Sequence, residues 1–171
     1  PMIASFAAAQ DWDGVWLFAY SHRADDWDAR CIRGFFDIDH NPAKWGFVPA
    51  GTAIFRDAGI EPLAGGQAWS VVEGDGLPLD LARLHRNFGL DLHRMLEEYW
   101  SMPPATPLGA RLAVTFAGQS FDLPKATGGG RESLTALQWT TQDARGTYRA
   151  SGRGALVEAG RAGGPWAFTH V

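Results

Sequence analysis

The segment from Gln10 to His22 constrains the fold more than any other part of the chain. Residues 11–14 have the composition of a turn, and residues 15–20, Val-Trp-Leu-Phe-Ala-Tyr, are apolar at every position. A strand that is apolar on both faces is typical of a parallel sheet covered by helices. The sequence therefore predicts a buried strand over residues 15–20, although few of the sister strands and covering helices that it needs are found in the chain.

The helices expected around this strand have clear local signals. Residues 2–10 are rich in alanine and predict a helix, and Asn41-Pro42 predicts the start of another, because Asn caps helices well and Pro suits the first helical position. We expect this second helix to be kinked at Pro49 and to end near Gly59. The residues that it is expected to turn toward a core are Trp45, Val48, Ile54 and Phe55.

Beyond residue 60 the pattern changes twice. Residues 69–73 predict a strand, residues 77–100 predict two helices, and residues 101–107 contain three prolines and predict a linker. From Leu108 onward short alternating runs punctuated by glycine predict antiparallel strands. These runs cover residues 111–116, 136–141, 147–150, 154–158 and 166–171.

Together these patterns predict an α/β to α+β fold in three zones. Residues 1–60 form strand-helix units, residues 61–106 form a mixed connector of strand and helix, and residues 107–171 form a β-rich, sandwich-like segment.

Composition excludes several classes of function. The 171 residues are 46% hydrophobic and 20% charged, and no apolar run reaches the roughly 18 residues that a membrane span requires. The net charge is −4 and the basic residues are scattered, which argues against nucleic-acid binding. Cys31 is the only cysteine, so no disulfide can form within the chain.

The turn, the apolar segment and the Gly34–Phe55 region share a family resemblance. With residues 2–10 they resemble the carboxy-terminal end of a (β/α)8-barrel retaining glycoside hydrolase of the β-galactosidase-like clan, followed by a β-rich segment. In that family the nucleophilic glutamate lies on the strand that would precede Met2, and the acid/base glutamate lies on an earlier strand. The resemblance thus implies a fragment of a glycosidase acting on β-linked sugars, without its two catalytic glutamates.

Candidate binding residues follow the predicted strand. Tyr20, Ser21 and His22 come at its carboxyl end, where barrel enzymes collect their functional side chains. The resemblance implies that Tyr20 or His22 contacts sugar and that Trp27 stacks on it. The alternative for each residue is packing or a solvated loop. We assign no catalytic residue and no cofactor. We also assign no metal, since the aspartates at 25–28 and 37–39 lack calcium-loop spacing.

Two other hypotheses stay open. The chain is also compatible with a stand-alone carbohydrate-binding module that uses exposed tryptophans. A third hypothesis keeps activity in the chain, through self-association that completes a barrel or through a carboxylate pair such as Asp37 with Glu73. The expected partner is a carbohydrate, and the open edge at residues 166–170 favours self-association or pairing with the rest of the barrel.

Overall fold

The computed structural model describes residues 1–25, 28–32, 34, 36–57, 59–70, 103, 105–115, 123, 132–142 and 145–160. In the order of the sequence, its elements are helices α1 and α2, strand β1, the short helix α5, and strands β2 to β5. The fold is therefore a mixture of helices and strands, as predicted. The predicted helices at 77–100 and the predicted strand at 166–171 lie outside the described residues.

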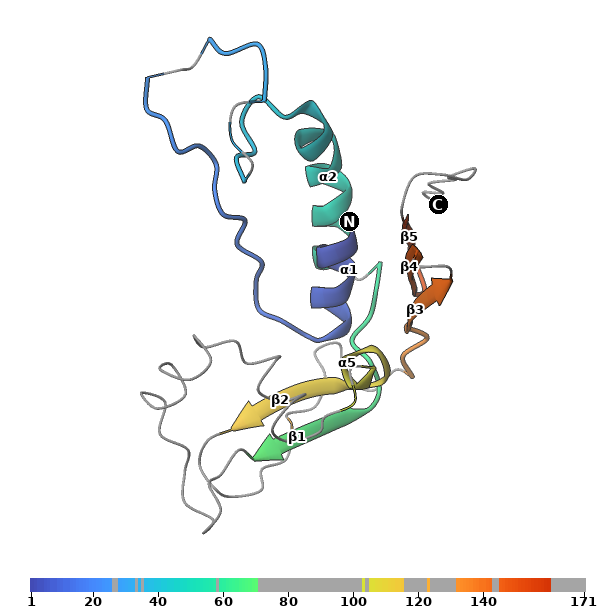
Figure 1. Ribbon diagram of the computed structural model, residues 1–171. Coiled ribbons are helices and arrows are strands. Elements are labelled where there is room, and N and C mark those ends of the chain that lie inside the picture. Colours follow the sequence, from blue (N-terminus) through green and yellow to red (C-terminus); the bar gives the residue numbers. More distant parts are fainter. Residues whose placement is uncertain are drawn as a thin grey trace.

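Two helices pack side by side at the amino-terminal end of the chain (Figure 1). α1 (Met2–Ala9) and α2 (Pro42–Arg56) confirm the two predicted helices, and the Asn41 side chain caps α2 by accepting a hydrogen bond from Lys44 N. α2 runs unbroken through Pro49 and ends at Arg56, earlier than Gly59.

Only some of the α2 residues that were predicted to face the core are buried. Ile54 is buried and Phe55 packs against the core, but Trp45 is 46% exposed. The prediction for Trp45 was wrong because the apolar periodicity does not reveal that the first turns of α2 face an open cavity and a loop rather than the core.

Residues 15–20 do not form the predicted strand. They are irregular, and most of their side chains are exposed, with Trp16 at 86%. Their last carbonyls instead accept hydrogen bonds from a loop: Ile38 N donates to Ala19 O and Tyr20 O, and Asp39 N donates to Tyr20 O. A strand needs a ladder of partners for its backbone groups, and no described strand runs beside this segment.

A small parallel sheet follows. β1 (Gly66–Ser70) overlaps the predicted strand at 69–73, and it pairs with β2 (Arg111–Thr115) in a register that joins Gly66 to Arg111. The prediction that all strands after Leu108 are antiparallel was thus wrong for β2. α5 (Thr106–Gly109) begins inside the predicted linker and leads directly into β2.

The last three described strands form the predicted antiparallel sheet. β3 (Ala136–Gln142), β4 (Arg145–Ser151) and β5 (Leu156–Gly160) follow one another as a meander with β4 in the middle. Opposite pairs are Trp139 with Tyr148 and Ala150 with Val157. The sheet lies beside α1 (Figure 1), and α1 contacts both β4 and β5.

The hydrophobic core joins the amino-terminal helices to this sheet. Small side chains on one face of α1 let the sheet approach closely, and larger apolar side chains fill the remaining space. The buried members of this cluster are Ala4, Ala8, Ala9, Ile54, Ile60, Leu63, Leu137, Tyr148, Ala150 and Val157.

Gln10 ties the end of α1 to α5 and β2. Its Nε2 donates to the carbonyls of Pro107 and Ala110 at 2.6 and 2.8 Å, and its Oε1 accepts from Leu112 N at 2.8 Å. The next residue, Asp11, has a left-handed φ of 61° and pairs with Arg111 at 3.4 Å. One buried amide thus satisfies three backbone groups at a junction between distant segments.

No helix among the residues described is long and apolar enough to cross a bilayer.

Candidate functional site

The candidate site is built on the loop that leads into α2. Lys44, in the first turn of α2, donates from Nζ to the carbonyl oxygens of Phe36 and Asp37 at 3.1 and 2.9 Å. Together with the Asn41 cap, these bonds hold the loop against the start of the helix. The loop position is therefore set by the same residues that begin α2.

The central feature of this loop is a hydrogen-bonded pair, His22 and Asp37. His22 Nδ1 hydrogen bonds to Asp37 Oδ1, and the two side chains differ sharply in exposure, 49% for His22 against 6% for Asp37. The hydrogen bond from His22 is the main reason that the pKa of Asp37 lies below its ordinary value, with a smaller contribution from the charge of Lys44. Asp37 is thus an ionised, shielded carboxylate behind an accessible imidazole.

Gly34 lies against this pair. A Cβ atom at position 34 would collide with the carboxylate group of Asp37. The close approach of backbone and carboxylate explains why the smallest residue occurs here. Any larger side chain at this position therefore requires the Asp37 carboxylate to move.

The residues before His22 are fastened to the same loop. The backbone bonds from Ile38 and Asp39 to Ala19 and Tyr20 bring the two segments together, and the Tyr20 ring meets Trp45 edge-on at a centroid distance of 6.1 Å. Tyr20 is 51% exposed. The site therefore presents an aromatic ring and an imidazole from neighbouring positions of one segment.

Ser21 has a local role. Its Oγ donates to the carbonyl of Arg23 at 3.0 Å and accepts from the backbone N–H of Arg23 at 3.1 Å. These bonds form a small turn that directs the chain away after His22. Of the four predicted binding residues, Tyr20, Ser21 and His22 lie together, whereas Trp27 lies outside the described residues.

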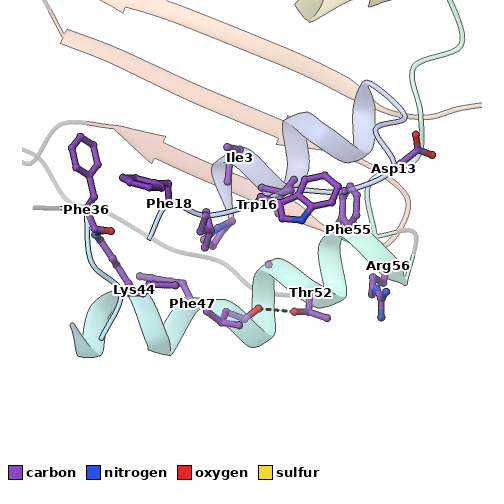
Figure 2. Close-up of a pocket in the computed structure, with 18 residues that line it drawn as sticks. Ile3, Asp13, Trp16, Phe18, Phe36, Lys44, Phe47, Thr52, Phe55 and Arg56 are labelled. Carbon is purple, nitrogen blue, oxygen red and sulfur yellow. Dashed lines mark hydrogen bonds between the residues drawn. The ribbon is translucent and has the colours of Figure 1, made fainter. Parts of the chain in front are cut away.

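An apolar cavity of about 840 Å³ opens beside this site. Figure 2 shows its wall of aromatic side chains, with Trp16 near Phe55 and Phe18 near Phe36. Its walls come from residues 13–18, from α1 and from the face of α2 that carries Phe47 and Phe55. Among the lining side chains, Lys44 and Arg56 are positively charged and Asp13 is negatively charged.

Phe18 connects the cavity to the His22–Asp37 pair. Its ring lines the cavity, meets the His22 imidazole edge-on at a centroid distance of 5.0 Å and lies 6.2 Å from the ring of Phe36. A polar pair and an apolar cavity thus share one wall.

Sequence reasoning found His22 but missed its partner. From the sequence, Asp37 was identified only as one of a group of aspartates and as one half of a carboxylate pair with Glu73. Glu73 lies outside the described residues. Asp39, the other aspartate of this patch, lies 3.6 Å from His40. The described residues contain no cluster of three potential metal ligands. The pairing of residues 22 and 37 has no sequence signal, since it depends on how the intervening loop closes.

The pair has a defined chemical capability. Of the two neutral tautomers of His22, the carboxylate at Nδ1 favours the one with its proton on Nδ1, which leaves a lone pair on Nε2. Nε2 can accept a hydrogen bond from a ligand hydroxyl, and protonation converts it into a donor. Such a fixed polar group beside aromatic rings is the usual composition of a small-molecule site.

Comparison with protein families, with curated proteins and with solved structures found no match for this chain.

Proposed function

We propose that this chain is part of a glycoside hydrolase acting on β-linked sugars, and that Tyr20, His22 and Asp37 form a wall of its sugar-binding site. The catalytic glutamates of such an enzyme belong to strands other than those of this chain. The sequence resemblance motivates the proposal, and the His22–Asp37 pair is the observation that supports it most directly.

The geometry suits a sugar for two reasons. A hydroxyl group needs an oriented polar partner, and the buried Asp37 orients the half-exposed His22. A sugar ring also has apolar faces that pack on aromatic side chains, and Tyr20 and Phe18 are exposed next to His22. The proposal also includes the partial barrel. Residues 15–20 would form a barrel strand only when neighbouring strands from the rest of the enzyme pair with them.

Binding of the 171-residue chain to glycans tests the proposal. The measurement is affinity electrophoresis in gels that contain a soluble β-glucan, β-galactan or β-xylan, with mobility normalised to a gel without polysaccharide. We expect retardation by at least one of these glycans. His22→Ala should weaken it up to about tenfold, because one hydrogen bond contributes up to about 1.5 kcal/mol.

Two further variants distinguish a specific loss of the binding site from a nonspecific effect of substitution. Gly34→Ala should weaken binding as His22→Ala does, since it displaces Asp37 without removing any polar group. His40→Asn is the control, because it removes the other described histidine with a residue that tolerates its left-handed φ of 53°. Retardation that is the same in His22→Ala, or absent with every glycan, would contradict the proposal.

Catalysis provides an independent check. Without the two glutamates, the chain should leave aryl β-glycosides uncleaved. Hydrolysis that persists through purification to homogeneity would support activity within the chain itself, through self-association or through Asp37.

A second candidate function is a stand-alone carbohydrate-binding module. The exposure of Trp16, at 86%, favours it, because binding modules hold polysaccharides on exposed aromatic rings. Retention on insoluble glycans that is lost in Trp16→Ala or Trp27→Ala but kept in His22→Ala would favour this second function over the first.

A further inference from the structure

The cavity beside the His22–Asp37 pair is wider and more apolar than a sugar requires. At about 840 Å³ it falls within the range of roughly 300 to 1,000 Å³ that small-molecule sites occupy. The aromatic residues that line it contribute rings with no hydrogen-bonding group except the Trp16 indole N–H. Only four other lining side chains, Asp13, Lys44, Thr52 and Arg56, carry polar groups, so most of the wall suits an alkyl or aryl group better than a sugar ring.

From this arrangement we propose that the ligand is an amphiphilic β-glycoside, with its sugar at His22 and a hydrophobic alkyl or aryl aglycone in the cavity. The proposal rests on the sugar site proposed above and names its substrate class. Phe18 is the residue that links the two halves, since one ring lines the cavity and contacts the His22 imidazole at 5.0 Å.

The charges around the cavity favour a neutral glycoside over charged amphiphiles. The lining includes Asp13 as well as Lys44 and Arg56, so the cavity has no single sign of charge. Lys44 Nζ already donates to the carbonyls of Phe36 and Asp37. The polar group nearest to Phe18 is a histidine paired with a carboxylate, which suits a neutral polyhydroxy head group better than a fatty-acid carboxylate.

Isothermal titration of the full chain with matched glycosides tests the proposal. The probes are methyl and octyl β-D-galactopyranoside and the two corresponding glucosides, all below the micellar concentration, with tetraethylene glycol monooctyl ether as a ligand that has the tail but no sugar. Each methylene that enters the cavity should tighten binding up to about fourfold. We expect the octyl glycoside of at least one sugar to bind at least about tenfold tighter than both its methyl counterpart and the sugar-free ether.

Variants on α2 assign the tail to the cavity. Val48 lines the cavity and is half-buried, so Val48→Phe should fill part of it and remove most of the advantage of the octyl chain. Ala53→Phe is the matched control, because Ala53 is exposed on the same helix and does not line the cavity. Circular dichroism of both variants verifies that α2 still forms.

The outcomes separate this inference from the sugar site. Equal affinity for octyl and methyl glycosides, with binding that still depends on His22, would overturn the inference and leave the sugar site intact. Equal affinity for the ether and the octyl glycoside, or an octyl advantage that survives Val48→Phe, would also overturn it. Absence of binding to every glycoside would overturn both proposals.

Discussion

Ser5 Oγ and Tyr148 Oη lie 3.1 Å apart inside the core, which joins the first helix to the middle strand of the antiparallel sheet across 143 positions of sequence. Ser5 also donates to the carbonyl of Met2 at 2.8 Å, so its hydroxyl proton is used locally and Tyr148 is the donor of the longer bond. The pair is the polar centre of an otherwise apolar contact between α1 and β4.

Tyr148→Phe should therefore destabilise the protein by about 1 kcal/mol, the typical net contribution of one buried hydrogen bond. Burial raises the pKa of Tyr148 above 10.0. The unfolded state then loses its proton first as the pH rises, so the stability that Tyr148 contributes is complete below pH 10 and is lost above it. Urea unfolding at neutral and alkaline pH checks both effects. Tyr148→Phe should show a smaller alkaline loss than the wild type, and an equal loss would contradict the assignment.

The stability that Asp37 contributes depends on pH in the opposite direction. His22 holds the pKa of Asp37 below its ordinary value near 3.8, so the folded state binds fewer protons than the unfolded state in the acid range. The stability from Asp37 is thus present above that ordinary value and is lost as the pH falls through the lowered one. Acid titration of unfolding free energy for wild type and Asp37→Asn measures it. We expect the unfolding free energy of Asp37→Asn to fall less steeply than that of the wild type as the pH is lowered. Parallel curves would show that the His22–Asp37 pair is not the source of the acid-dependent loss of stability.

Gln10 offers a test of the junction between α1 and β2. Gln10→Ala should cost about 2 kcal/mol, because it removes the partners of three backbone groups at least partly shielded from water. Gln10→Glu should be worse at neutral pH than at acid pH, since an ionised carboxylate would face two carbonyl oxygens. Gln138→Ala, on an exposed position of β3, is the control and should change stability by less than about 0.5 kcal/mol. Similar losses for the two alanine variants would contradict the role of Gln10.

Two glycines should respond in opposite directions to alanine. Gly46 is inside α2 with open space around it, so Gly46→Ala should stabilise the protein by about 0.5 to 1 kcal/mol. A Cβ at Gly152 would lie 2.7 Å from the carbonyl oxygen of Gly59 and 3.0 Å from Ile60 Cα, so Gly152→Ala should destabilise it by about 2 kcal/mol. Thermal unfolding of the two variants measures both changes. A melting temperature of Gly152→Ala that is equal to or above that of the wild type would show that the contact between residues 59–60 and 152 is not made.

The elements that sequence reasoning located well have local signals. The alanines of α1 and the Asn41-Pro42 start of α2 act within one turn of helix, and the alternation in β3 and β4 acts between neighbours along the strand. The elements that it missed depend on distant partners. Residues 15–20 have the composition of a strand, but hydrogen bonds from residues 38 and 39 occupy the carbonyls at positions 19 and 20. β2 has the pattern of an antiparallel strand, yet its described partner is the parallel β1.

The candidate site shows the same division. The sequence alone determined that an apolar run ends in polar and aromatic side chains, Tyr20, Ser21 and His22, and that α2 begins at Pro42. Both features depend on residue type and short spacing. Only the tertiary structure decided that Asp37 would become the partner of His22 and that Phe18 would link this pair to a cavity. Loop closure brings those groups together, and its geometry depends on the Lys44 bonds and on the space left at Gly34, which no local pattern encodes.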